Sequence, residues 1–313
     1  MKLTRIFFVT DVHGSTDCWK KFINAGKFYE ANALLLGGDM TGKGLVTIVK
    51  MSDGTVKGNF RGKESILDSA EKLEKFRRII SMSGYYPYDA TETEIEEFRT
   101  NPDKLNSIFL DLMKQRLSEW MKFADERLKD TGVKCYVCPG NDDLFEIDEV
   151  FTQSSTIVNA SGKLTSIDDN HEVINLGWSN PTPWKTPREC SEEELAKKIE
   201  AQVSQLKDVK NSIFQLHPPP FESQLDVAPK LDESLKVVYG ESISVGSTAV
   251  RDAVMKYQPL LGLFGHIHES DGAVKMGRTL CINPGSVYTE GVLKGAVINL
   301  DKSSVKSYYS ITG

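Results

Sequence analysis

Four of the chain's five histidines stand, with two aspartates and one asparagine, directly after short apolar segments. In the pairs Asp11-Val-His13 and His266-Ile-His268, alternate residues of an extended segment point to the same side. Carboxylate, amide and imidazole groups without a thiolate suit divalent ions such as Mn, Fe, Co, Ni or Zn, and differ from the cysteine-rich sets of structural zinc sites. The predicted metal ligands are Asp11, His13, Asp39, Asn141, His217, His266 and His268.

These seven side chains are more than one catalytic ion needs, and they fit two ions that share a bridging carboxylate. Two divalent ions carry more positive charge than two carboxylates cancel, so the centre would attract a phosphate ester. The same charge would lower the pKa of a bridging water, and the resulting hydroxide would attack phosphorus in line. The sequence contains no Gly-rich phosphate loop and no Ser or Cys nucleophile signature that would favour another mechanism.

The apolar segments before these residues are short and β-rich, and helical patterns separate them, which is typical of an α/β fold. Functional groups in such sheets gather beyond the carboxyl ends of the strands, so the candidate ligands are expected to converge. The predicted strands are residues 5–10, 33–38, 133–140, 212–216 and 260–265.

The spacing of apolar residues predicts helices between these strands, and two of them have sequence signals for their first residue. Ser191 opens a capping box with Glu194, and Ser247 precedes a helical pattern that reaches Tyr257. In the last quarter, residues 272–282 and 292–311 read as hairpins that form a second sheet. The other predicted helices are 16–29, 64–81 and 103–129.

The long stretch between Asp39 and Asn141 is predicted as an insertion, about residues 42–130, within a single domain 1–313. It begins with a β-hairpin over residues 45–60, whose turn is Asp53-Gly54, and continues with helices. The hairpin starts just after Asp39, so the insertion could overhang the site as a specificity cap. The alternative is that its helices merely cover the sheet.

The charge balance gives 38 lysines and arginines against 44 aspartates and glutamates, a net charge of −6. An acidic chain is a poor candidate for nucleic-acid binding, which needs concentrated positive charge. No apolar run approaches the ~20 residues that span a bilayer, the first residues do not resemble a signal peptide, and the five cysteines are scattered. We therefore expect a cytoplasmic protein without a membrane partner.

Several other residues are predicted to be structural. His171 is expected in a solvated loop, and the pair Cys135 and Cys138 is expected to pack in a buried strand rather than bind zinc. The loop from Trp178 to Trp184 could line a substrate cleft or cover a sheet edge. The acidic run 192–194 is typical of a helix N-terminus.

The ordered motifs resemble the calcineurin-like metallophosphoesterase superfamily. They are Asp11-Val-His13, Gly38-Asp39, Gly140-Asn141, His217 and Gly265-His266-Ile-His268. Residues 217–226 and 266–270 further look like the Icc-related phosphoesterases, and residues 283–286 are similar to the segment that follows the paired histidines in several branches of the superfamily. The resemblance implies a four-layer α-β-β-α sandwich. It also implies one metal on Asp11, His13, Asp39 and His268 and another on Asp39, Asn141, His217 and His266.

One position departs from the pattern of these relatives, in which a histidine follows the metal-binding asparagine and assists the leaving group. Here Asn141 is followed by Asp142, and these two are the predicted catalytic residues. An aspartate is normally ionised near neutral pH, so it is a poor proton donor and repels a phosphate dianion more than a diester monoanion. This substitution predicts a preference for phosphodiesters or for good leaving groups.

The predicted function is therefore hydrolysis of a small-molecule phosphate ester by a dinuclear centre, with manganese expected to be active in vitro. A non-catalytic metal-binding scaffold of the same fold is the alternative from another class, because the usual histidine is missing. A nuclease is a second alternative, and the net acidity counts against it. A membrane-associated lipid hydrolase would need a basic amphipathic segment, whereas residues 62–130 are mixed in charge.

Overall fold

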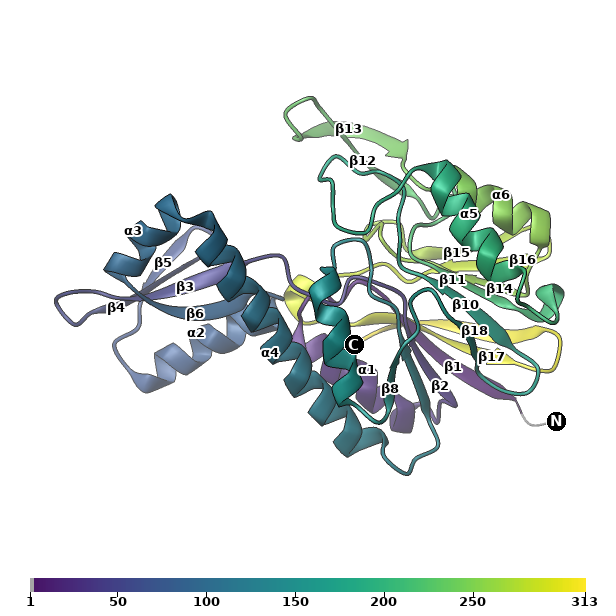
Figure 1. Cartoon of the computed structure of the whole chain (residues 1–313), viewed down its shortest axis with the longest axis horizontal. Coiled ribbons are helices and arrows are strands. Elements are labelled where there is room, and N and C mark those ends of the chain that lie inside the picture. The colour runs from purple at the N-terminus through teal and green to yellow at the C-terminus, as the bar shows by residue number, and fades with distance from the viewer. Residues whose placement is uncertain (1–2) are drawn as a thin grey trace.

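The computed structural model describes residues 3–313, in which two six-stranded sheets pack face to face and a four-stranded sheet forms a separate lobe (Figure 1). The first sheet, in the order β18-β17-β1-β2-β7-β8, consists of β1 (Thr4–Val9), β2 (Ala33–Leu36), β7 (Lys134–Val137), β8 (Ile157–Asn159), β17 (Lys294–Leu300) and β18 (Val305–Thr312). The second, in the order β15-β16-β14-β11-β10-β9, consists of β9 (Leu164–Ser166), β10 (Glu172–Leu176), β11 (Ile213–Leu216), β14 (Leu261–Leu263), β15 (Gly272–Met276) and β16 (Thr279–Asn283).

Successive side chains along each strand point to opposite faces of the sheet, so the apolar core has one part between the two sheets and another between the sheets and the helices. Ile6 and Phe8 of β1 point toward the second sheet and join a cluster that contains Ile213. Phe7 points the opposite way, into a cluster with helices α1 (Thr16–Phe28) and α4 (Pro102–Leu128). Helices α5 (Glu192–Val203) and α6 (Thr248–Tyr257) cover the outer face of the second sheet in the same manner. The mixed α/β class predicted from the sequence is confirmed.

The five predicted strands all form, and they are divided between the two central sheets. β2 pairs in parallel with β1 and β7, whereas β11 pairs in parallel with β14 in the other sheet. The prediction that the hairpins of the last quarter form a second sheet is wrong, because they are divided between the two central sheets. The hairpin β15–β16 extends one central sheet and β17–β18 extends the other, since each finds an unpaired strand edge there.

Residues 43–101, which we call the insertion lobe, project from the two central sheets (Figure 1). Their sheet has the order β5-β4-β3-β6 and includes the predicted hairpin. The predicted helix 64–81 begins later than expected, because residues 63–66 pair with β4 and Ser69 caps the following helix by accepting from the Lys72 amide. The lobe contains β3 (Leu45–Lys50), β4 (Val56–Phe60), β5 (Lys63–Ile66), α2 (Ala70–Met82), β6 (Tyr86–Thr91) and α3 (Glu92–Thr100).

The predicted helix starts at Ser191 and Ser247 are confirmed, since each hydroxyl accepts a backbone hydrogen bond from its helix. Only half of the expected capping box forms, because Glu194 pairs instead with Lys198 at 3.1 Å. No helix within residues 3–313 combines the length and apolarity needed to cross a membrane. The remaining elements are β12 (Val227–Leu231), β13 (Val237–Ser244) and short 3-10 helices at Phe145–Gln153, Val209–Asn211 and Tyr288–Glu290.

Two predictions about isolated residues have opposite outcomes. His171 is not solvated but buried, with Nδ1 at 2.9 Å from both oxygens of Asp168, which also accepts from the Thr4 hydroxyl. The sequence neighbours of His171 are polar, and its burial depends on tertiary contacts that the sequence pattern does not show. Cys135 and Cys138 are buried as predicted, and burial raises the pKa of both thiols.

Candidate metal centre

The loops that follow β1 and β2 are joined by backbone hydrogen bonds, and several of their residues have unusual backbone conformations. The amide of Asp11 donates to the carbonyl of Gly38 (3.0 Å), and that of His13 donates to the carbonyl of Asp39 (2.9 Å). Asp11, His13, Asp39 and His266 all have left-handed φ angles, of 54°, 38°, 47° and 68°. Such conformations cost non-glycine residues about 1–3 kcal/mol each and concentrate at functional sites. Four of the seven candidate ligands are therefore held in strained positions.

At two glycines of the motifs there is no room for a side chain, because a candidate ligand lies against the backbone. A Cβ atom on Gly38, whose φ is +146°, would lie 2.0 Å from Nδ1 of His217. A Cβ atom on Gly140 would lie 2.2 Å from Oδ1 of Asp39. Each candidate ligand therefore rests directly against backbone that carries no side chain.

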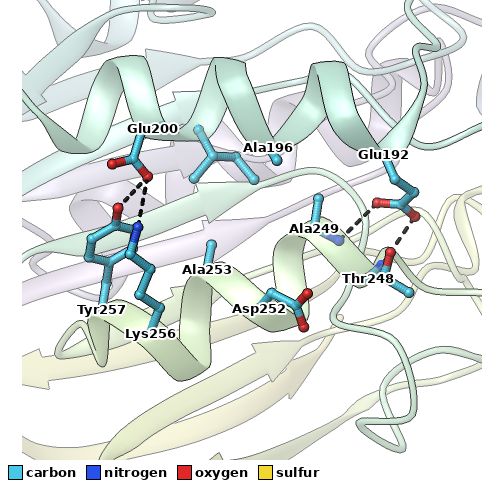
Figure 2. A pocket seen from close by; sticks show the side chains of 10 residues that line it. Glu192, Ala196, Glu200, Thr248, Ala249, Asp252, Ala253, Lys256 and Tyr257 are labelled. Carbon is cyan, nitrogen blue, oxygen red and sulfur yellow. Dashed lines mark hydrogen bonds and ion pairs between the residues drawn. The ribbon is translucent and has the colours of Figure 1, made fainter.

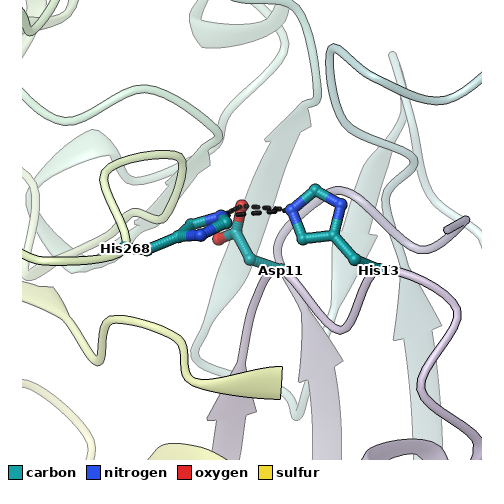
Figure 3. Close-up of side chains that lie close together, drawn as sticks. All are labelled: Asp11, His13 and His268. Carbon is teal, nitrogen blue, oxygen red and sulfur yellow. Dashed lines mark hydrogen bonds and ion pairs between the residues drawn. The ribbon is translucent and has the colours of Figure 1, made fainter. Parts of the chain in front are cut away.

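Three candidate ligands from two sheets meet in a first cluster, Asp11, His13 and His268 (Figure 3). Nε2 of His268 lies 3.2 Å from Oδ1 of Asp11 and 3.1 Å from Nε2 of His13. Two imidazole nitrogens and a carboxylate oxygen thus face one another at the end of β1. This is the donor arrangement that binds a divalent ion.

A second cluster contains Asp39, His217 and His266. Oδ2 of Asp39 is 3.5 Å from Nε2 of His217 and 3.6 Å from Nε2 of His13, so this oxygen lies between the two clusters. Nδ1 of His217 faces the carbonyl of Gly37 at 3.0 Å. Because a carbonyl only accepts, Nδ1 carries a proton, and Nε2 is the nitrogen that can bind a metal ion once its own proton is lost.

Three buried side-chain atoms in this region have no hydrogen-bond partner among residues 3–313, namely Nδ1 of His13, Oδ1 of Asn141 and Nε2 of His217. The amide nitrogen of Asn141 donates to the hydroxyl of Thr186 at 2.8 Å, which leaves the oxygen as the free end. A buried polar atom without a partner costs about 1–3 kcal/mol, and a bound cation would remove that cost. The residues present therefore fit a centre for divalent metal ions.

The electrostatics of the clusters favour charged carboxylates and, for two of the histidines, neutral imidazoles. Burial would raise the pKa of Asp11, but the hydrogen bond and charge of His268 outweigh it and hold that pKa well below its usual range. Burial lowers the pKa of His13 to about 3 and that of His266 to about 4, so both rings keep lone pairs. Burial opposes protonation of His217 as well, but the charge of Asp39 raises its pKa to about 9. A metal ion bound there would replace that proton.

Asp142 lies beside the clusters with its charge partly balanced. Its amide donates to Oδ1 of Asp39 (3.0 Å), and its carboxylate pairs with Nζ of Lys43 (2.8 Å). Burial and the nearby Asp39 raise the pKa of Asp142 to about 6, against the lowering effect of Lys43. Lys43 was not predicted from the sequence, where its only signal is its position between two glycines at the start of the insertion lobe.

Several residues outside the predicted set hold the loops of the site. The carboxylate of Asp143 accepts from the amides of Met40, Thr41 and Gly140, and so joins the loops after β2 and β7. Asn283, from the motif 283–286, donates to the carbonyl of Ile267 at 3.0 Å and so fixes the loop between the paired histidines. Tyr288 was also missed, and its ring centroid lies 4.6 Å from that of His13.

The loop between Trp178 and Trp184 was predicted either to line a cleft or to cover a sheet edge. The ring of Trp178 packs against Phe145 at 5.8 Å and under the ammonium of Lys198 at 4.2 Å, and Trp184 is exposed. The following segment reaches the site instead, through Thr186.

A groove of about 280 Å³ between α5 and α6 is a poor candidate for the reaction centre (Figure 2). It lies on the outer face of the second sheet, and its polar groups are already engaged. Glu192 accepts from the amide of Ala249, and Glu200 pairs with Lys256 and with the hydroxyl of Tyr257. The clusters at the strand ends are therefore the better candidate for the reaction centre.

Known proteins resemble this chain over most of its length. Residues 4–270 match the profile of the calcineurin-like phosphoesterases. The protein MJ1162 of Methanocaldococcus jannaschii is 33% identical over 149 residues, which cover 47% of this chain and only 61% of that protein. The solved structure of TT1561 from Thermus thermophilus is 13% identical, covers 100% of this chain and 99% of its own, and has a TM-score of 0.55. Another solved structure, 16% identical, covers 97% of this chain and 98% of its own, with a TM-score of 0.58. These structural similarities concern the fold.

Proposed function

The chain belongs to the calcineurin-like phosphoesterase family, and we propose that it hydrolyses small-molecule phosphate esters with two divalent metal ions. The observation that carries this proposal is the position of Asp39, whose Oδ2 lies within 3.6 Å of His13 and 3.5 Å of His217, between the two clusters. One ion would be held by Asp11, His13, Asp39 and His268. The other would be held by Asp39, Asn141, His217 and His266.

Ions bound at these residues would supply positive charge for the phosphate group and a water molecule activated for attack on phosphorus. The protein's own part is to hold the ligands in place. The carbonyl of Gly37 keeps the lone pair of His217 on Nε2, and Thr186 turns the amide oxygen of Asn141 to the free side. Asp143 holds the loops that carry Asp39 and Asn141 in register.

The substrate preference follows from Asp142, which stands where relatives have a histidine that assists the leaving group. Nearby metal ions would keep this carboxylate ionised, so it would be a poor proton donor. Its charge is balanced by Lys43 at 2.8 Å, so it would repel a phosphate dianion only weakly, and the lack of a proton donor is what would disfavour poor leaving groups. We therefore propose esters with good leaving groups, including activated phosphodiesters, as the preferred substrates.

The test is a substrate screen with protein loaded with manganese, across diesters, monoesters and nucleotides, for the wild type and Asp39→Asn. Hydrolysis by the wild type, lost together with bound metal in Asp39→Asn, would support the proposal. A wild type that binds no metal and hydrolyses none of these esters would overturn it and favour a scaffold role. Equal rates on alkyl monophosphates and activated diesters would overturn only the substrate preference.

A further inference from the structure

Lys43 occupies the first position of the insertion lobe, and its backbone is fixed on both sides by one residue. The amide of Gly42 donates to the hydroxyl of Tyr86 at 3.0 Å. The amide of Tyr86 donates to the carbonyl of Gly44, also at 3.0 Å. Lys43 therefore sits in a short bridge between two anchored glycines, although its side chain is about half exposed, at 47%.

Tyr86 is in turn held by a buried arginine that reaches from α4 to the metal centre. The guanidinium carbon of Arg116 lies 4.1 Å from the ring centroid of Tyr86. Its Nη1 donates to the carbonyl of Tyr85 (2.8 Å) and to that of Gly14 (2.9 Å), the residue after His13. The lobe and the loop of the first cluster are thus tied together, so the position of Lys43 relative to the cluster is set by the fold.

The ammonium group of Lys43 is held beside the clusters with hydrogen-bonding capacity to spare. Nζ lies 2.8 Å from Oδ2 of Asp142, and that same oxygen is 3.9 Å from Nδ1 of His13. An ammonium has three donors, and the ion pair with Asp142 is its one polar contact among residues 3–313. Two donors therefore remain for a group that enters from the solvent side.

We propose that Lys43 binds substrate, and that its ammonium group contacts the non-bridging oxygens of a phosphate held at the metal centre. This inference rests on the proposed function, since it assigns a phosphate ester to the same site. It explains how the site tolerates Asp142, because the lysine that neutralises this carboxylate also supplies a fixed cation for the substrate. A lysine suits this role as a compact point charge on a flexible stem.

The test measures binding of inorganic phosphate to manganese-loaded protein by calorimetry, with metal content determined for each variant. Lys43→Ala is expected to weaken phosphate binding about 10-fold or more, since a charge-assisted hydrogen bond is lost. Lys43→Arg should restore most of the affinity. Lys57→Ala is the matched control, because Lys57 is another lysine of the insertion lobe and forms an ion pair with Glu64 at 3.5 Å. The Lys57→Ala protein should bind phosphate as tightly as the wild type does.

Two outcomes would overturn the proposal: a fully metallated Lys43→Ala that binds phosphate as tightly as the wild type, or a metallated wild type that binds no phosphate. A third comparison tests whether Lys43 binds phosphate itself or only neutralises the charge of Asp142. If Lys43→Ala has no effect in an Asp142→Asn background, the lysine serves only to balance the carboxylate, and the proposal fails. A continued loss in that background supports it.

A different result would contradict the proposed function. If Lys43 governs phosphate affinity but the wild type hydrolyses no ester, the enzymatic proposal is wrong and the binding role of Lys43 stands. If esters are hydrolysed, Lys43→Ala should raise KM at least as much as it lowers kcat, because the contact forms with the bound phosphate before reaction.

Discussion

The side-chain amide of Asn141 donates a 2.8 Å hydrogen bond to the hydroxyl of Thr186, which in turn donates to Oε1 of Glu189 at 2.6 Å. This chain of hydrogen bonds decides which end of the Asn141 amide is free, because the nitrogen is engaged and the oxygen is not. A loop of the second sheet thus orients a candidate ligand that follows a strand of the first.

Thr186→Val should therefore lower the affinity for divalent ions about 10- to 100-fold, as loss of a group that orients a metal ligand typically does. Calorimetric titration with manganese measures the change in affinity. Thr186→Ser keeps the hydroxyl and should bind metal like the wild type. Unchanged affinity in the valine variant would mean that Asn141 does not depend on this contact.

Asp39→Asn should remove bound metal and reduce hydrolysis by at least about 100-fold, because the shared oxygen between the clusters loses its charge. Metal analysis of purified protein and a diesterase assay measure the two effects. Asp68→Asn is a suitable control, since Asp68 pairs with Lys72 on the exposed surface of the lobe. Retention of two ions per chain by Asp39→Asn would contradict the bridging role.

Asp142→His should raise the rate for alkyl esters relative to activated esters by about 100-fold, since it introduces a proton donor for poor leaving groups. The ratio of kcat/KM for the two substrate types is the quantity to compare. Asp142→Asn removes the charge without adding a donor, so it controls for the loss of the ion pair with Lys43. A ratio that is equal in the histidine and asparagine variants would refute proton donation as the cause.

Manganese is expected to stabilise the folded chain, because under the proposed function it would bind the native clusters of buried carboxylates and unpartnered acceptors. At a free concentration about 100 times its dissociation constant, the free energy of unfolding should rise by about 2.7 kcal/mol. Thermal melts with metal and with a chelator would record a shift of several degrees. An equal shift in Asp39→Asn would indicate that the stabilising ions bind elsewhere.

Arg116→Met should destabilise the protein by about 3 kcal/mol, because the carbonyls of Gly14 and Tyr85 would lose a buried donor. Urea unfolding measures the loss. Arg127→Met, on the exposed side of the same helix, loses a stacking contact with Phe123 and should cost about 0.5 kcal/mol. Similar costs for the two variants would show that Arg116 does not tie the lobe to the site.

The strands and the convergence of the candidate ligands were predictable because both depend on local patterns. Residues 5–10 and 260–265 have the apolar composition of buried strands, and the polar pairs Asp11/His13 and His266/His268 mark their ends. Their division between two sheets was implied by the family resemblance but not by these local patterns. Pairing of β11 with β14 rather than with β2 depends on contacts between distant segments, which no local pattern contains.

The residues that sequence reasoning missed act through single long-range contacts. Lys43 and Thr186 carry no motif, and each gains its role only when a loop brings it to Asp142 or Asn141. His171 was misjudged for a related reason. Its neighbours in sequence are polar, but in the fold its ring is buried against Asp168, which also accepts from Thr4 at the start of β1.

The absent side chains of Gly38 and Gly140 leave His217 and Asp39 in contact with bare backbone, with no room to shift. Such a pocket has its shape before any ion arrives, so an ion would neither fold nor remodel it. Imidazole, carboxylate and amide donors accept several first-row metals, and selection among them then depends on which metal is available. We therefore expect the metal content of the purified protein to depend on the growth medium. Protein from manganese-rich and from iron-rich media should carry different metals on the same ligands.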